Sequence, residues 1–407
     1  MAELLTELKK GMASFTMIGS AKISTDTFKG VQQPKEGKYW ASIKTSIPIE
    51  IETGVRIFPE INDGYMTNNP VIKRFPAEKS EDGGMLDIPF KNRLDEKMIE
   101  KVASYTLFKT NIEKDENGKP IMKYFIHGLD FEAYLKEHLK NDMEIRIQGD
   151  VEYSFNKDRE KEYRNYRVKG VFLNEGYEKN EEFVEPLAHS ATMRQTYFVE
   201  AGALDSRWEK DLENKGKTVV SAFVPSYMSK IWDGKAYVEF KKTVAIPQAI
   251  NILVADPNDE KSLGRSKVLA KKLFDVPKKK VRQINLVVKI NEGFETGTVD
   301  VEVDPELQEL IDAGLMTIED IEKQLTVRGE RVSEILLIKP NVKINDEGKT
   351  VIDIEDDKYA ADVLVFPEFE ISKDDESEVF EKKSESDEIV ADPTQGMGDD
   401  EFDALFN

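Results

Sequence analysis

The sequence predicts a mainly β protein with helical insertions, built as two successive barrel domains and followed by an acidic tail. Three observations support this class. The run at 39–51 alternates between apolar and polar residues, which is typical of a half-buried strand. Apolar residues at helical spacing at 129–141 fall between strand patterns, and residues 368–407 hold 15 acidic residues against three lysines.

The composition indicates the compartment and excludes several chemistries. A chain of 407 residues is long enough for two or three domains, each with its own core. It contains no cysteine, which excludes disulfides, thiolate nucleophiles and cysteine-ligated zinc. The first residues lack the apolar core of a signal peptide, and no stretch approaches the roughly 20 apolar residues of a membrane span. We therefore expect a cytoplasmic protein without a membrane partner, in the host cytoplasm if it is viral.

The formal net charge of -21 is unevenly distributed along the chain. The segment 368–407 carries -12 of it, so the rest of the chain carries only -9. Binding of nucleic-acid phosphates requires local positive potential rather than a positive total charge. A cationic groove on a mildly acidic body is therefore compatible with this composition.

The chain is expected to open with a short helix and two strands. Residues 1–13 form an N-terminal helical segment in this prediction, because Leu4, Leu5 and Leu8 have amphipathic spacing. A strand with a glycine bend follows from Phe15. In the strand at 39–51, Tyr39 shares the apolar face with alternate residues, whereas Trp40 lies on the polar face.

The second half of the first domain contains a loop, a hairpin, a helix and two strands. Residues 62–95 carry glycines, prolines and mixed charges, which predicts a long loop. Strands at 105–112 and 121–128 flank the turn DENGK, and the predicted helix at 129–141 comes next. Two final strands are joined by the charged loop NKDREKE. Together these elements define a first domain at 14–178.

The predicted order is strand, strand, strand, helix, strand, strand, with the helix between the third and fourth strands. This is the plan of the OB fold, a five-stranded barrel that binds oligonucleotides. The segment GKPIMKYFIHGLDFEAYLKEHLKNDMEIRIQGDVEYSF, followed by a charged hairpin and YRNYRVKGVFL, resembles the second half of bacterial and phage single-stranded-DNA-binding proteins. In that family a strand ends in an aromatic-glycine pair, a helix follows, and a further strand leads into a long basic hairpin arm. Where the family often has a stacking phenylalanine before the glycine, this chain has His127.

An acidic linker at 179–193 leads to a second OB-like domain at 194–366. Its strand candidates are TVVSAFVPSYM, AYVEFKKTVAIP and VRQINLVVKI; PELQELIDAGL and IEDIEKQ are helical, and LTVRGERVSEILLIKPNVKI gives two final strands. IQGD at 147–150 and VRGE at 327–330 each follow a helical pattern. This weak repeat favours a second barrel, with the segment 262–277 as an inserted helix. The tail at 367–407 is predicted to be disordered.

The first domain offers the two features that a nonspecific single-strand binder needs, cations along the phosphates and exposed aromatic faces for the bases. The charged hairpin interleaves basic and aromatic residues. The nucleic-acid-binding candidates of this domain are Trp40, Lys44, Lys123, Phe125, His127, Arg146, Tyr153, Phe155, Lys157, Arg159, Tyr163, Arg164 and Arg167. Aromatic residues in strands are commonly core residues, so the core interpretation stays open for Tyr153, Phe155 and Tyr166.

A basic segment in the second domain, at 265–282, has Asp275 as its single counter-charge. The candidates for phosphate contact are Lys271, Lys272, Lys278, Lys279, Lys280 and Arg282, with Trp232 as a stacking residue. The alternative interpretation is a solvated amphipathic helix followed by a lysine turn.

The tip of the tail combines acidic residues with two phenylalanines. The candidates for partner binding are Asp399, Asp400, Glu401, Phe402, Asp403, Leu405 and Phe406. Such a segment suits an apolar pocket with a basic rim on a partner. It resembles the acidic C-terminus through which single-stranded-DNA-binding proteins contact replication, repair and recombination enzymes, although Asn407 follows the last phenylalanine. An ordinary solubilising tail is the alternative.

No pattern indicates catalysis, a metal site or a cofactor. His127, His138 and His189 lack ligand spacing, and neither a phosphate loop nor a serine elbow occurs. The sequence therefore predicts a non-enzymatic protein that binds single-stranded DNA without sequence preference, acts in replication, recombination or repair, and recruits partners through its tail. The alternatives are a replisome or recombination adaptor whose barrels bind protein, and a single-stranded RNA-binding protein.

Overall fold

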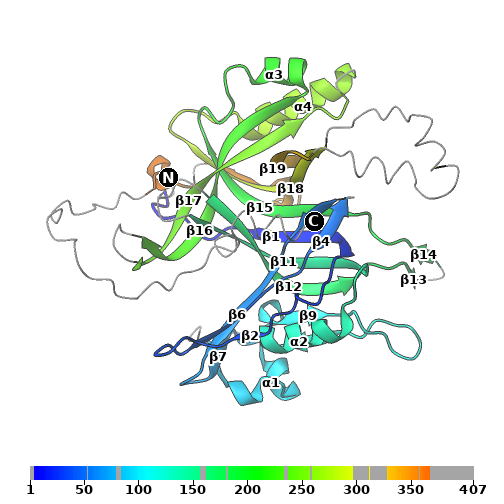
Figure 1. The fold of residues 1–407 in the computed structure, drawn as a ribbon. Coiled ribbons are helices and arrows are strands. Elements are labelled where there is room, and N and C mark those ends of the chain that lie inside the picture. Colours follow the sequence, from blue (N-terminus) through cyan, green and yellow to red (C-terminus); the bar gives the residue numbers. More distant parts are fainter. Residues whose placement is uncertain are drawn as a thin grey trace, which may run out of the picture.

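The computed structural model is mainly β, as predicted, with two barrels joined through one continuous sheet (Figure 1). It describes residues 4–366 except 53, 79–83, 156–161, 180–181, 233–236, 257–258, 297–310, 312–327 and 357. The two helices predicted within 305–324 lie outside the described residues apart from Ile311, and so does the tail at 367–407.

The first barrel has the predicted OB plan, with one helix between its third and fourth strand positions. Its elements are β1 (Ala13–Ala21), β3 (Trp40–Ser46) with β4 (Ile49–Glu52), β5 (Val55–Ile57) with β6 (Glu60–Met66), α2 (Gly128–His138), β11 (Glu144–Phe155) and β12 (Glu162–Leu173). β1 pairs antiparallel with β4 and with β11, β5 and β6 pair with β4 and β3, and β11 pairs with β12. A parallel contact between β6 and β12, at Glu60 and Arg167, closes the ring. A short strand, β2 (Val31–Gln32), adds to the edge of β3.

The second strand position is broken at Pro48, which separates β3 from β4. Proline has no N–H to donate to a ladder, so it marks a break in the strand. The preceding residue keeps its bond, because the N–H of Ile47 donates to the carbonyl of Pro59 at 2.8 Å. The chain thereby pairs with β6 before the break and with β1 after it, which curves the sheet into a barrel.

The third strand of this barrel was predicted wrongly. The prediction used the strand at 121–128, but the barrel position belongs to β5 and β6, and β6 runs into the predicted loop at 62–95. The sequence EINDGYM does not have the pattern of a strand, because the outer face of β6 carries Glu60, Asn62 and Gly64 and only Ile61 is fully buried. A polar outer face next to a glycine has loop composition.

The segment between β6 and α2 is a structured insertion. Its elements are β7 (Val71–Arg74), β8 (Leu86–Pro89), η1 (Phe90–Asn92), α1 (Glu96–Lys101), η2 (Ser104–Thr106), β9 (Phe108–Thr110) and β10 (Lys123–Phe125). β7 and β8 form a hairpin over a small core of their own that includes Ile72, Ile88 and Val102. The predicted hairpin around DENGK is present, since β9 pairs with β10.

The second barrel repeats the same strand order. Its elements are β15 (Ser190–Glu200), α3 (Trp208–Lys215), β16 (Lys217–Trp232), β17 (Tyr237–Leu253), α4 (Glu260–Phe274), β18 (Val281–Thr296) and β19 (Arg328–Pro340). The ring runs β15, β16, β17, β19, β18 and back to β15, with β17 and β19 parallel. Asp259 caps the start of α4 by accepting from the N–H groups of Lys261 and Ser262.

The internal repeat was aligned wrongly. The helix predicted as an insertion at 262–277 is α4, which occupies the OB helix position between the third and fourth strands. IQGD therefore lies in the fourth strand of the first barrel, whereas Gly329 lies in the fifth strand of the second. The final segment gives one long strand, β19, and then small elements: β20 (Val342–Ile344), β21 (Thr350–Ile352), β22 (Ile354–Asp356) and η3 (Ala361–Leu364).

The predicted N-terminal helix is absent from the described part of that segment. Residues 4–12 bend at Thr6 and Glu7 and form no helix; Leu5 is in a bridge to Tyr359, and Leu8 is in a buried cluster with Phe198 and Tyr359. The leucine spacing therefore reflects docking on the second barrel rather than helical packing. The predicted linker at 179–193 contains a strand, β14 (Glu182–Val184), which pairs with β13 (Tyr177–Lys179), and β15 begins within it at Ser190.

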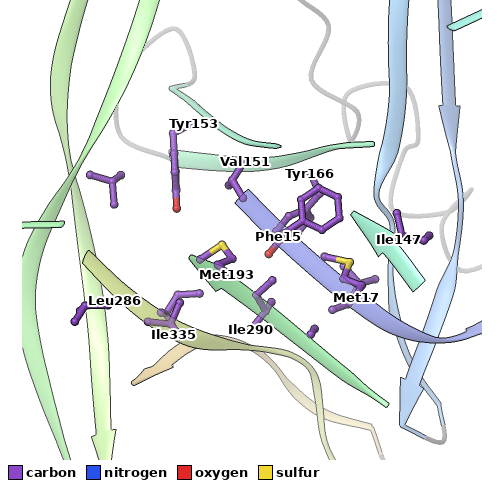
Figure 2. Close-up of a cluster of buried hydrophobic side chains, with 14 of the residues drawn as sticks. Phe15, Met17, Ile147, Val151, Tyr153, Tyr166, Met193, Leu286, Ile290 and Ile335 are labelled. Atoms are coloured by element: carbon purple, nitrogen blue, oxygen red, sulfur yellow. The ribbon is translucent and has the colours of Figure 1, made fainter. Parts of the chain in front are cut away.

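The two barrels share a core. β1 pairs antiparallel with β15 from Ala13 opposite Gln195 to Ile18 opposite Ser190, so the first strands of both barrels lie side by side (Figure 1). Figure 2 shows side chains of the first barrel, such as Phe15 and Tyr166, packed with Met193 and Ile290 of the second. The barrels are therefore one packed unit rather than two domains on a flexible linker.

Candidate nucleic-acid interface

The outer face of β3 and β6 is the surface that OB barrels use for oligonucleotides. Ala41, Ile43 and Thr45 are buried inside the barrel, so the alternate residues of β3 point outward. The outward pairs across the two strands are Trp40 with Met66, Ser42 with Gly64, and Lys44 with Asn62. The predicted polar face of this strand is thus confirmed as the outer face.

Trp40 presents an exposed ring on this face. It is 53% exposed, although it is a large aromatic residue at the paired first position of β3. A Cβ atom placed on Gly64 would lie 2.4 Å from the indole, so the ring lies directly over this glycine. The absence of a side chain at Gly64 is what lets the indole rest on the backbone of the neighbouring strand. A flat, supported and solvent-facing ring is suited to stacking against a base.

The cations of this face are paired with carboxylates. Lys44 Nζ lies 3.5 Å from Glu60, and Arg167 contacts Glu60 and, at 2.8 Å, Glu152. Glu60 is almost fully buried between the two cations. Two positive and two negative charges make this end of the face neutral in total.

The predicted site on 123–127 is wrong for His127 and Phe125. His127 is fully buried; its Nδ1 accepts from the N–H of Leu129 at the start of α2, and burial lowers its pKa. Phe125 packs on Phe131 and Tyr134, with ring centroids 5.8 and 5.4 Å apart. These side chains therefore hold α2 against the barrel.

Lys123 also faces α2. Its ammonium forms an ion pair with Glu113 at 2.7 Å and lies 5.1 Å from the centre of the Tyr134 ring. It is half-buried in this position. The three residues predicted for one groove thus form part of the helix packing.

The hairpin β11–β12 is docked on the second barrel and does not project freely at its base. Arg164 forms an ion pair with Glu292 of β18 at 2.8 Å, and Tyr166 donates to the same carboxylate at 2.9 Å. Tyr153 and Tyr166 are core residues, which corrects the predicted role of Tyr153, and its hydroxyl donates to Gln195. The basic and aromatic residues at the base of this hairpin therefore serve to pack it against the second barrel.

The other hairpin candidates divide between packing and exposure. Phe155 is half-buried against Phe366 at 5.7 Å between ring centroids, and Tyr163 is half-buried. Arg146 is half-buried over the ring of Phe172, 5.2 Å from its centre. Lys157 and Arg159 lie outside the described residues.

In the second barrel, Arg282 is structural. Its guanidinium is bidentate to Asp356 at 2.7 and 3.0 Å and donates to the carbonyls of Lys272 and Leu273 at the end of α4. The other predicted phosphate contacts of the basic segment are exposed on α4 and the turn after it: Lys271, Lys272, Lys278, Lys279 and Lys280. Trp232 packs edge to face on Tyr237, 5.3 Å between centroids, at the end of the β16–β17 hairpin.

Sequence reasoning missed Tyr39, Gly64 and Met66. Tyr39 was placed on the apolar face, but it precedes the first residue of β3 and is exposed, as is Met66 opposite Trp40. A signal was available in the sequence, since Gly64 lies within the short run INDGYM, two positions after Asn62 and two before Met66. Glycine within a strand often marks a close approach of another group, and here that group is the indole.

The predicted partner-binding residues Asp399, Asp400, Glu401, Phe402, Asp403, Leu405 and Phe406 lie outside the described residues. Among the residues that are described, no three His, Asp or Glu side chains are grouped to hold a metal ion. In the same described part of the chain, no helix has the length and apolar character to cross a membrane.

The fold defines the chain as a protein of two OB-type barrels with a shared core. No family model matches its sequence, and no curated protein matches it. Among solved structures, a deletion mutant of the single-stranded DNA binding protein from Thermus aquaticus is similar at 9% identity, over 70% of this chain and 88% of that one, with a TM-score of 0.27. A likeness of this size is too remote to bear on the activity of this chain.

Proposed function

We propose that this protein binds single-stranded DNA without sequence preference, and that the outer face of β3 and β6 is its main contact surface. The observation that carries the proposal is the exposed indole of Trp40, supported by Gly64 on the face that OB barrels use for oligonucleotides. Stacking accepts any base, because every base has a π-face. Met66, the ladder partner of Trp40, and Tyr39, its neighbour in the chain, are also exposed at this end of β3 and β6.

Phosphate contacts come from cations near this ring. Lys44 lies on the same strand, and Lys29 and Lys35 are exposed before and after β2, which pairs with β3. The exposed lysines of α4 provide a second cationic surface on the other barrel. Each phosphate that a cation neutralises releases counterions, so the affinity falls as salt rises.

The proposed biological role follows from nonspecific binding of single-stranded DNA. The protein coats transient single strands in replication, recombination or repair in the cytoplasm, without catalysis, metal or cofactor. Its acidic tail, tipped by Phe402 and Phe406, recruits partner proteins by placing a ring in an apolar pocket with a basic rim.

A titration with poly-dT, poly-U and duplex DNA tests the proposal. We expect poly-dT to bind with a steep dependence on salt, and duplex DNA to bind much more weakly at the same salt concentration. Equal or tighter binding of poly-U would make the protein an RNA binder. No binding of any strand would favour an adaptor whose barrels bind protein.

We expect Glu152→Gln to tighten the binding of oligo-dT by about twofold to fivefold and to increase the salt slope by about 0.7. The exposed carboxylate of Glu152 contacts the guanidinium of Arg167 at 2.8 Å, and Glu60 contacts the same guanidinium. Neutralising Glu152 removes one of these two carboxylates, so a phosphate can take its place beside Arg167. Fluorescence titrations at several salt concentrations measure both quantities. Glu347→Gln changes the net charge equally at a distant exposed pair with Lys349, and an equal gain there would refute a local effect.

We expect deletion of the nine residues from Asp399 to leave the affinity for oligo-dT equal or higher, since four carboxylates leave the chain. The same deletion should abolish the binding of a partner enzyme that the full chain captures. Anisotropy with labelled oligo-dT and a pull-down with that enzyme measure the two effects. A loss of DNA binding would contradict this division of roles.

A further inference from the structure

A second aromatic surface lies on the insertion and the β9–β10 hairpin, away from the β3–β6 pairs. We call it the insertion surface and define it by Phe75, Tyr105, Lys109 and Tyr124. Tyr105 is 69% exposed, Tyr124 42% and Phe75 40%. Large aromatic side chains are usually mostly buried, so three exposed rings near one lysine require an explanation.

The backbone brings these residues together from separate elements. Phe75 follows β7, and its carbonyl accepts from the N–H of Ala103 just before η2. This contact places the ring of Phe75 beside that of Tyr105, with centroids 6.1 Å apart and planes inclined by 34°. The two rings thus form one inclined apolar surface.

Lys109 links this ring pair to the third ring. Its ammonium donates to the hydroxyl of Ser104, the neighbour of Tyr105, at 2.8 Å. In the sheet, Lys109 is directly opposite Tyr124 on β10, so both side chains lie on the same face. The ammonium is thus bonded to the neighbour of Tyr105 on a side chain that shares a face with Tyr124, and it keeps two further protons to donate.

The residues that pair with Lys109 across the sheet carry no charge that could neutralise its ammonium. Gly170 of β12 is its partner on the other side, and Gln148 of β11 pairs with Gly170. Neither of these residues, nor Tyr124, carries a negative charge. In contrast, the cations of the β3–β6 face pair with Glu60 and Glu152.

We propose that the insertion surface is a second base-stacking site, which binds unpaired bases of the same strand beyond the β3–β6 face. This inference rests on the proposed function. Exposed rings supply the stacking, Lys109 supplies a phosphate contact, and stacking on a ring accepts any base. The insertion continues directly from β6, whose last residue, Met66, is the ladder partner of Trp40. In this proposal the bound DNA strand therefore passes from one site to the other along elements that are connected in the chain.

The test compares a short and a long strand. Oligo-dT of about 8 nucleotides fills roughly one OB barrel, whereas oligo-dT of about 35 nucleotides spans both sites. In the double variant Tyr105→Ala with Tyr124→Ala, we expect affinity for the long strand to fall about tenfold or more, the occluded site size to shrink, and affinity for the short strand to remain within about twofold. Tyr105→Phe with Tyr124→Phe keeps the rings and should bind as the wild type does.

Controls separate this inference from the proposed function. Leu94→Ala removes an exposed aliphatic side chain of the same insertion and should leave both affinities unchanged; thermal melting confirms that all variants are folded. Wild-type affinity and site size in the alanine variant, while Trp40→Ala still weakens binding, would overturn the second site alone. Retained DNA affinity with loss of a bound partner protein would make the surface a protein contact and would also overturn it. A wild-type protein that binds no strand would overturn the proposed function itself.

Discussion

Trp40→Ala should lower the affinity for oligo-dT by about 5- to 150-fold at fixed salt, which corresponds to the roughly 1 to 3 kcal/mol of one stacked base. The expected loss is large because the indole is the best supported ring of the β3–β6 face, lying directly over Gly64. Since the side chain is mostly in solvent, its removal leaves the core intact, and the melting temperature should not change. Fluorescence anisotropy with labelled oligo-dT measures the affinity.

Two further variants define what the Trp40 result means. Trp40→Phe keeps a ring at the same position and should recover part of the affinity, which a merely structural role would not explain. Ile344→Ala removes an even more exposed apolar side chain on β20 and should have no effect. An unchanged affinity in Trp40→Ala would remove the β3–β6 face from consideration as the binding surface.

The position of Trp40 could be predicted because a single alternating strand carries the information. Residues 40–46 have period-two alternation, and one face of such a strand is buried wherever it lies in a barrel. The same reasoning failed for Phe125 and His127, because both depend on α2, whose packing partner the local pattern does not specify. Phe125→Ala would therefore cost stability by removing a contact with Phe131, and it does not test stacking.

The strand order could be predicted only in part. The helix at 129–141 and the strands after it were correct to within a few residues, since each has a strong period of its own. The third strand was missed because β6 has a polar outer face and one glycine. Its pairing with β3 defines this strand, whereas its own sequence has no clear apolar pattern. In the second barrel, α4 was found but given the wrong position, because the repeat paired strands that are not equivalent.

The basic hairpin shows most clearly why residue type alone does not identify a binding site. Arg164 and Tyr166 meet Glu292, which lies more than a hundred residues later in the chain and on the other barrel. A pattern of alternating basic and aromatic residues is the same whether it faces a nucleic acid or a carboxylate of a neighbouring domain. Only the fold brings Glu292 to this hairpin. Its presence there changes the interpretation of Arg164 and Tyr166 from phosphate or base contacts to contacts that dock the two barrels.

Arg164→Ala should lower the free energy of unfolding by about 3 to 5 kcal/mol, the cost of leaving one member of a buried ion pair without its partner. The Arg164 and Glu292 side chains are only 12% and 17% exposed, so solvent screens the stranded carboxylate weakly. Lys349→Ala breaks an exposed pair with Glu347 and should cost less than about 1 kcal/mol. Urea titrations followed by circular dichroism compare the two variants.

The same variant distinguishes a structural arginine from a phosphate contact. If Arg164 joins the barrels, replacing both partners with Arg164→Met and Glu292→Met should restore most of the stability, because no buried charge is left alone. The salt slope of oligo-dT binding should then equal that of the wild type, since no cation has left the binding face. A variant with unchanged stability and a reduced slope would instead return Arg164 to the nucleic-acid interface and would mean that the hairpin opens away from the second barrel when a strand binds.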